Sequence, residues 1–158
     1  MQQHVYSVDK NVGIIDVFVD SDWAGDARTS KSTTGVVIKL GGTVIKTYSR
    51  NQKTIALSSA EAELYAIVSG VSEAIGIQSL VQDLGFNCKI RCHTDSTAAT
   101  GSTKRAGVGR VRHLNTQFLW IQQVVNEGRV EIAKVPSADN SADLLTKYLD
   151  SSATAGHV

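Results

Sequence analysis

Four acidic residues stand at positions where a folded chain could use them for chemistry. Asp20 ends one apolar strand pattern and Asp95 ends another. Glu63 lies in the first turns of a long helical pattern, and Asp143 lies in the last one. Carboxylates held close together push one another toward protonation, and hard divalent cations with oxygen ligands relieve that repulsion. If the four acids meet, they form a Mg²⁺ site.

Each acid alone also has an ordinary structural explanation. An Asp at a strand end is commonly a cap or a turn residue, and Glu63 could be a solvated helix residue. Asp22 and Asp26 show that acids are frequent in the first part of the chain. Spacing does not bring the four acids together. They meet only if the first and fourth strands are neighbours, because ligands of open α/β sheets gather at the carboxyl ends of strands.

The elements that must position these acids follow from the hydrophobic pattern. The β-rich runs 14–20, 33–40 and 43–48, with Gly41-Gly42 between the last two, predict three antiparallel strands and a tight hairpin. A stripe from Leu64 to Ile75 at helical spacing then predicts a long helix. Ser58 and Glu61 form its expected capping box, and Gly85 marks its end.

The second half of the chain alternates strands and helices. Lys89–Thr94 is a predicted strand, the segment after Asp95 begins a helix, and a stripe from Leu114 to Val125 predicts another helix, closed by Gly128. A last strand, Arg129–Val135, precedes a short helix opened by Asp139, which we interpret as its cap. The predicted class is α/β: a five-stranded mixed sheet, three antiparallel strands then two parallel, with helices on both faces.

Length and composition describe one globular domain. The chain has 158 residues, 42% hydrophobic and 20% charged, with a net charge of +1. We divide it into an upstream lead-in (1–13), a catalytic domain (14–149) and a disordered tail (150–158). No apolar run reaches the roughly 20 residues of a transmembrane helix, so no membrane partner is expected.

The two cysteines are predicted to be buried thiols in a reducing compartment. Cys88 and Cys92 would lie on one face of a strand about 13 Å apart, too far for a disulfide. The alternative, a zinc site with the neighbouring His93, has too few ligands.

A basic segment lies between the second and third helical patterns. Residues 96–113 contain four cations and no acid, so the rest of the chain is acidic. The cations are Lys104, Arg105, Arg110 and Arg112. The segment also contains Gly101, Gly107 and Gly109, which are typical of a mobile loop. Such a loop could bind the phosphates of a nucleic acid, or it could be an ordinary solvent-exposed loop.

Neutral side chains are weaker candidates for substrate contacts. Ser58, Asn115 and Thr33 could bond a nucleic-acid backbone or a 2′-hydroxyl, the group that distinguishes RNA from DNA. Trp23 and Trp120 are interpreted as packing residues rather than as platforms for bases.

Six motifs, in order along residues 14–149, resemble the ribonuclease H domain of copia-type LTR retrotransposon polyproteins, a retroviral-type RNase H-like fold. They are Val19-Asp-Ser-Asp-Trp-Ala-Gly-Asp26, Lys31-Ser-Thr-Thr-Gly35, Ala56-Leu-Ser-Ser-Ala-Glu-Ala-Glu63-Leu-Tyr-Ala66, His93-Thr-Asp-Ser96, Arg110-Val-Arg-His-Leu114 and Val135-Pro-Ser-Ala-Asp-Asn-Ser-Ala-Asp143-Leu-Leu-Thr-Lys147. The family's fold has the same order of strands and helices.

The resemblance implies an endonuclease that hydrolyses the RNA strand of RNA–DNA hybrids during reverse transcription. It implies two Mg²⁺ ions, with Mn²⁺ able to substitute, held by Asp20, Glu63, Asp95 and Asp143. Asp20 would bridge both ions, Glu63 and Asp95 would hold one, and Asp143 the other. Asp22, Glu61 and Asp139 are the competing acids. They are set aside as turn, capping-box and helix-cap residues.

The resemblance also implies an adjoining reverse transcriptase domain and an intracellular, cytoplasmic location, in a virus-like particle. The family's histidine before the last helix is absent here, and His113 is the histidine that stands in a motif. Two alternatives stay open: a non-catalytic RNase H-like module that binds nucleic acid or protein, and an integrase-type transferase, which would leave Asp143 unexplained.

Overall fold

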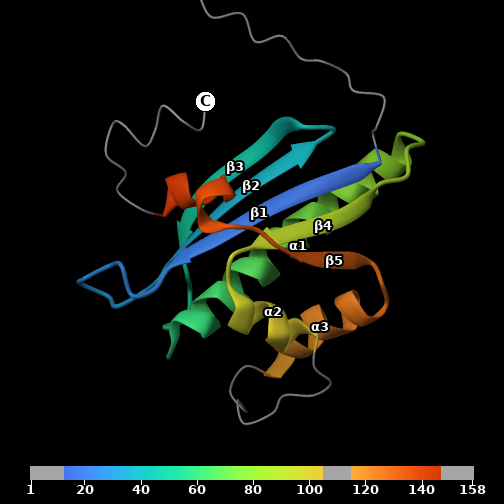
Figure 1. Ribbon diagram of the computed structural model, residues 1–158. Coiled ribbons are helices and arrows are strands. Elements are labelled where there is room, and N and C mark those ends of the chain that lie inside the picture. The colour runs from blue at the N-terminus through green and yellow to red at the C-terminus, as the bar shows by residue number, and fades with distance from the viewer. Residues whose placement is uncertain (1–12, 105–114, 147–158) are drawn as a thin grey trace, which may run out of the picture.

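The computed structural model describes residues 13–104 and 115–146, and all structural statements below concern these two ranges (Figure 1). They form five strands, three α-helices and two short 3₁₀ helices. In chain order these are β1 (Ile14–Asp22), β2 (Thr33–Leu40), β3 (Thr43–Asn51), α1 (Ser59–Asp83), β4 (Lys89–Thr94), α2 (Thr97–Thr103), α3 (Asn115–Asn126), β5 (Val130–Lys134), η2 (Ser137–Asp139) and η3 (Asp143–Leu145).

The strands form one mixed sheet in the order β3-β2-β1-β4-β5. β1 pairs antiparallel with β2 and parallel with β4, and β4 pairs parallel with β5. This confirms the predicted sheet, and it makes the first and fourth strands neighbours. The carboxyl ends of β1 and β4 therefore lie side by side.

The hairpin between β2 and β3 forms at the two glycines. Leu40 pairs with Thr43, so the loop is Gly41-Gly42, and both glycines have positive φ, 55° and 80°. A two-residue turn with positive φ at both positions matches the twist of the strands that it joins.

The α-helices pack on one face of the sheet, with α1 behind β1 and β2 in Figure 1. The alternate residues Ile15, Val17 and Val19 of β1 are fully buried in the same core as Ile67 and Ile121, from α1 and α3. Alternation in β1 thus separates a core face from a face that carries Asp16, Phe18 and Asp20.

That second face is covered in part by η3, which contacts β1 and β2. Gly35 of β2 makes this approach possible, because a β-carbon there would lie 2.8 Å from Thr146 Cγ2 and 2.9 Å from Leu145 Cβ. The α-helices therefore cover one face of the sheet and the 3₁₀ helix η3 covers part of the other, so both faces carry helices, as predicted.

Three details of the sequence prediction are wrong. β1 continues to Asp22, so Asp20 does not end its strand. Gly101 lies inside α2, not in a loop. The last segment forms 3₁₀ turns up to Thr146 rather than an α-helix, and Asp139 is the last residue of η2 rather than a helix cap. The predicted lead-in and tail lie almost wholly outside the described residues.

Both helix ends that were assigned to glycines are confirmed. Gly85 and Gly128 adopt positive φ, 88° and 69°. After α1, Phe86 N–H bonds Val81 O, and after α3, Arg129 N–H bonds Val124 O. These are the bonds of a helix that ends at a left-handed residue.

The cysteines are as predicted: both are buried and they form no disulfide with each other. The zinc alternative fails on geometry. Cys92 faces the core, whereas His93, the next residue, faces the other side and lies 2.8 Å from Asp16 Oδ1.

α1 is long and apolar enough, by length and composition, to span a membrane. In the part of the chain that is described, it is the core helix of the sheet, with Leu64, Ile67 and Val71 buried.

The close contact between α1 and β1 gives a stability prediction. A β-carbon at Gly70 of α1 would lie 2.6 Å from Val19 Cγ1 and 3.0 Å from Val17 Cγ1. Gly70→Ala is expected to lower the free energy of unfolding by about 1–3 kcal/mol, because the helix must move off the sheet. Urea unfolding followed by circular dichroism measures it.

Gly76 on the same helix is the matched control, since its β-carbon would meet nothing within 4 Å. Gly76→Ala should leave stability unchanged or raise it by up to about 1 kcal/mol through helix propensity. Equal effects of the two substitutions would contradict the packing described here.

Candidate metal-binding active site

Three of the four predicted acids meet at the carboxyl ends of β1 and β4. Asp20, Glu63 and Asp95 each offer a carboxylate oxygen, and these three oxygens lie within 4.8 Å of one another. They come from β1, from α1 and from the residue after β4. The pairing of β1 with β4 thus supplies the proximity that spacing along the sequence could not.

Asp20 is almost completely buried, at 2% exposure. Its backbone pairs with Gly35, and its Oδ2 accepts a hydrogen bond from the hydroxyl of Thr146. Asp22, the competing acid, is more exposed and lies outside the three-carboxylate group. Asp20, the acid that the resemblance favours, therefore joins the group, although it does not end its strand.

Glu63 enters the group because α1 begins where it does. Ser58 caps the helix, its hydroxyl accepting from Glu61 N–H at 3.2 Å. Glu61 Oε2 accepts from Leu57 N–H at 2.9 Å, so Glu61 is used in fixing the helix start, as its capping role predicted. Glu63, half a turn further on, instead reaches β1, where Ser21 donates to its Oε1 from both N–H (3.2 Å) and Oγ (2.8 Å).

The environment of Glu63 raises its pKa to about 7, from an ordinary 4.5. Burial is the main cause, and the charges of Asp20 and Asp95 add to it, while the hydrogen bonds from Ser21 act in the opposite direction. Among the described residues nothing donates to Glu63 Oε2, although that atom is buried. This carboxylate has a vacant lone pair in a site that disfavours its negative charge.

Asp143, the fourth predicted acid, is close but outside the three-carboxylate group. Ser137 connects it, because its Oγ lies 2.8 Å from Asp95 Oδ2 and 3.2 Å from Asp143 Oδ2. One hydroxyl has one proton, so it can donate to only one of these two carboxylates at a time. The two acids therefore face the same small space from the β4 end and from η3.

Asn140 holds the segment that carries Asp143 against the sheet. It is fully buried, its Nδ2 donates to Val19 O at 2.9 Å, and its Oδ1 accepts from Ala142 N–H at 3.2 Å. Val19 is the residue before Asp20. Asn140 therefore fixes η3 directly beside the buried acid of β1.

Sequence reasoning missed the polar residues that support the acids: Ser21, Ser137, Asn140 and Thr146. Single Ser, Thr and Asn residues form no periodic pattern, and the signal that could have found these four is their place in the Val19–Asp26 and Val135–Lys147 motifs. Only the pairing of distant segments reveals their partners, which for Asn140 and Val19 are 121 positions apart.

The predicted substrate residues are only partly described. Ser58 and Lys104 are exposed, Ser58 as the cap of α1 and Lys104 at the end of α2. The backbone of Asn115 begins α3, and its side chain lies outside the description. Arg105, Arg110, Arg112 and His113 lie outside the described residues. These substrate contacts stay predictions.

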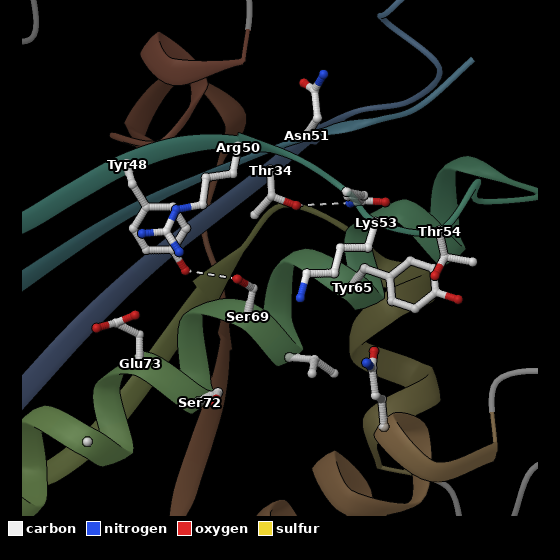
Figure 2. Close-up of a pocket in the computed structure, with 14 residues that line it drawn as sticks. Thr34, Tyr48, Arg50, Asn51, Lys53, Thr54, Tyr65, Ser69, Ser72 and Glu73 are labelled. Carbon is white, nitrogen blue, oxygen red and sulfur yellow. Dashed lines mark hydrogen bonds between the residues drawn. The ribbon is translucent and has the colours of Figure 1, made fainter. Parts of the chain in front are cut away.

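A cavity in the described parts of the chain lies away from the acids. It has a volume of about 540 Å³ and lies between β3 and α1, away from all four carboxylates. Figure 2 shows Lys53 extending into it above α1, with Arg50 over the ring of Tyr48. The acid group lies apart from this cavity, at the carboxyl ends of β1 and β4.

The wall of this cavity is coupled to the acid group through Gln52. Its Nε2 donates to Thr34 Oγ1 and to Ala62 O, both at 2.9 Å. Thr34 pairs with Ser21, and Ala62 precedes Glu63. Gln52 therefore ties the start of α1 to the strands beneath it, next to the acids.

The three carboxylates fit a hard divalent cation. All the donors are oxygen, the preferred ligands of Mg²⁺, and the group is three negative charges when ionised. A cation would satisfy Glu63 Oε2 and lower the pKa of that carboxyl.

Comparisons with known proteins agree with this fold. The chain is 32% identical over 138 residues, 86% of its length, to the retrovirus-related Pol polyprotein from transposon TNT 1-94 of Nicotiana tabacum. It is 33% identical over 141 residues to that from transposon RE1 of Arabidopsis thaliana, again over 86% of its length. The chain spans about a tenth of the length of these polyproteins. No protein-family model matches it.

Among solved structures, LC11-RNase H1, isolated from compost, has a TM-score of 0.65 at 18% identity, covering 84% of this chain and 92% of that one. RNase H1 from the archaeon Halobacterium salinarum has a TM-score of 0.62 at 20% identity, covering 84% and 94%. LC11-RNase H1 in complex with RNA/DNA hybrid gives 0.59 at 20% identity, covering 83% and 92%.

The sheet order, the helices and these neighbours define the class: this is a ribonuclease H-like domain. Its sequence relatives are more specific. The chain belongs with the RNase H domains of retrovirus-related Pol polyproteins from plant copia-type transposons.

The raised pKa of Glu63 predicts how stability depends on pH without metal. The folded state binds this proton more tightly than the unfolded chain does, since its pKa is about 7 against 4.5. The stabilising contribution is therefore complete below pH 4.5 and is lost as the pH rises through 7. Urea unfolding in EDTA at pH 5 and pH 8 measures the loss.

Glu63→Gln should remove this part of the pH dependence, because the amide does not titrate. In the unaltered protein, Mn²⁺ should raise the melting temperature more at pH 8 than at pH 5, since the ion binds the ionised carboxylate. A Mn²⁺ shift of the same size at both pH values would contradict the placement of Glu63 in the metal site.

Asn140→Ala tests the attachment of η3. It leaves Val19 O buried without this donor, so the free energy of unfolding should fall by about 1–3 kcal/mol. The neighbouring Asp139 is exposed, and Asp139→Ala should change stability by less than about 0.5 kcal/mol. The urea unfolding midpoints of the two variants measure both effects. An unchanged midpoint for Asn140→Ala would contradict the role of Asn140 in holding η3 against the sheet.

Proposed function

We propose that the domain is a ribonuclease H that hydrolyses the RNA strand of RNA–DNA hybrids with divalent cations. The observation that carries this proposal is the meeting of Asp20, Glu63 and Asp95, with oxygens within 4.8 Å, in a ribonuclease H-like fold. LC11-RNase H1, which shares the fold, has been crystallised with an RNA/DNA hybrid.

The chain's own residues have separate tasks in this reaction. Asp20, Glu63 and Asp95 would hold a cation against the scissile phosphate, and Ser21 orients the Glu63 carboxylate through two hydrogen bonds. Bound divalent ions supply an activated water and stabilise the leaving 3′-oxygen, which gives 5′-phosphate and 3′-hydroxyl ends.

Asp143 would complete a second ion site. Ser137 lies between Asp143 and Asp95, where its hydroxyl occupies the space that two carboxylates share. A cation held by Asp143 and Asp95 would offset their repulsion in place of this hydroxyl. We propose Mg²⁺ as the ion, two ions in total, and Mn²⁺ as a substitute.

The relatives extend this proposal to the surroundings of the domain. They are Pol polyproteins, so we propose that a reverse transcriptase domain adjoins this one and that the hybrid is a product of reverse transcription. A cytoplasmic, virus-like particle location is part of the same proposal. The alternative, a non-catalytic binding module, has less support because all four acids are present.

A cleavage assay with a labelled RNA–DNA hybrid tests the function. Mg²⁺ should support cutting of the RNA strand, EDTA should abolish it, and Asp95→Asn should lower the rate at least about a hundredfold, because it weakens a metal ligand. Cutting that survives Asp95→Asn would refute this site.

Asp22→Asn and Asp139→Asn are the matched controls, since both acids were candidates from the sequence and neither belongs to the three-carboxylate group. Each should retain at least about half of the activity, as most substitutions away from metal ligands do. No cutting at high enzyme with either Mg²⁺ or Mn²⁺ would favour the binding module.

A further inference from the structure

Trp23 is half exposed, at 50%, although it is one of the largest apolar side chains in the protein. It follows the last residue of β1, and its Nε1 donates to Ala56 O at 3.1 Å. This hydrogen bond fixes one edge of the indole against the segment before α1. The remaining ring surface faces solvent, so packing, which the sequence suggested for this residue, accounts for only part of it.

Two more large apolar side chains flank the residue to which Trp23 is bonded. Ile55 is 49% exposed and Leu57 is 69% exposed, whereas Ala56 between them is buried. Trp23, Ile55 and Leu57 therefore form an apolar rim. Large exposed apolar side chains that gather around one point of the chain mark sites where something binds.

The rim lies beside the carboxylates. Ser21, two residues before Trp23, donates to Glu63, whereas Trp23 donates to Ala56 O, three residues before α1 begins. Leu57 is likewise next to Ser58, the cap of the helix that carries Glu63. A protein that covered the rim permanently would also crowd the acids. The occupant consistent with a working site is the molecule on which the acids act.

We propose that Trp23 contacts the hybrid, its exposed ring face packing against sugars of the strand beside the scissile phosphate. This inference rests on the proposed function and adds a residue that helps to determine its substrate. The apolar rim formed with Ile55 and Leu57 provides the surrounding contact area.

The chemistry of an RNA–DNA hybrid suits such a contact. Helices with A-like geometry have a wide, shallow minor groove that exposes sugars to a protein surface. The Nε1–H of Trp23 is already used by Ala56 O, so the indole reads shape and apolar surface, not a hydroxyl group.

Tryptophan fluorescence tests the contact directly. The chain has two tryptophans, so Trp120→Phe leaves Trp23 as the single emitter. Asp95→Asn, added to prevent cleavage, allows titration with a short fluorescein-labelled hybrid in Mg²⁺. Trp23 emission should change saturably, with the same midpoint as the anisotropy of the labelled hybrid, and a DNA duplex of the same sequence should produce a smaller change.

Each outcome decides the matter. Hybrid binding by anisotropy with unchanged Trp23 emission would overturn the contact and leave the proposed nuclease intact. An unchanged KM for cleavage by Trp23→Ala would likewise overturn the contact and leave the proposed nuclease intact. If the unaltered protein neither binds nor cuts the hybrid with Mg²⁺ or Mn²⁺, the proposed function fails, and the contact fails with it.

Kinetics of Trp23→Ala give the second measurement. KM for the hybrid should rise about tenfold, the lower end of what one aromatic contact to a nucleotide contributes, while kcat stays within about twofold. Trp23→Phe, which keeps a ring, should recover part of the loss. The Mn²⁺-induced rise in melting temperature should persist in both variants, showing that the acid group is still formed.

Leu84→Ala is the matched control. Leu84 is 70% exposed but lies at the far end of α1, roughly 30 Å from Glu63 at 1.5 Å per helical residue. Its removal should leave KM unchanged. Equal effects of Leu84→Ala and Trp23→Ala would mean that general loss of apolar surface, not contact at the rim, explains the result.

Discussion

Electrostatic repulsion among the carboxylates is the constraint on which the arrangement of this domain depends. Three carboxylate oxygens within 4.8 Å repel one another, and burial removes the water that would weaken the repulsion. The raised pKa of Glu63, about 7, is the direct consequence. A fold that holds such a group must support it by hydrogen bonds, by protonation or by cations, and the same need is the basis on which we propose a metal site here.

Hydroxyl groups provide that support from separate parts of the chain. Ser21 donates to Glu63, Thr146 to Asp20, and Ser137 lies between Asp95 and Asp143. Thr146 reaches Asp20 because Gly35 has no side chain to exclude η3 from the sheet. The glycine in β2 is thus as necessary to the site as the hydroxyl that it admits.

The sequence predicts the elements of this fold better than it predicts the site. Strand and helix patterns, and the glycines at 41–42, 85 and 128, are local signals, and the structure confirms them. Asp20, by contrast, is predicted from its place in the Val19–Asp26 motif and from an expected strand end, and β1 runs on to Asp22. The prediction of a final α-helix is also wrong for the residues up to Thr146. There the hydrogen bonds of Asn140 to Val19 and Ala142 favour short 3₁₀ turns against the sheet. Such long-range bonds have no local signature.

The acids also explain why affinity for a polyanion must come from other residues. Without metal, the group repels phosphates, and the chain as a whole has a net charge of only +1. Cations in residues 96–113 offset the acidic remainder, but charge attracts any nucleic acid alike. Apolar contacts depend on the width of a groove and on the sugars within it, so they can favour one kind of duplex. In the function that we propose, the carboxylates would attract phosphates only with a bound metal ion. Trp23, Ile55 and Leu57 would then recognise the shape of the duplex, so that catalysis and recognition fall to different residues.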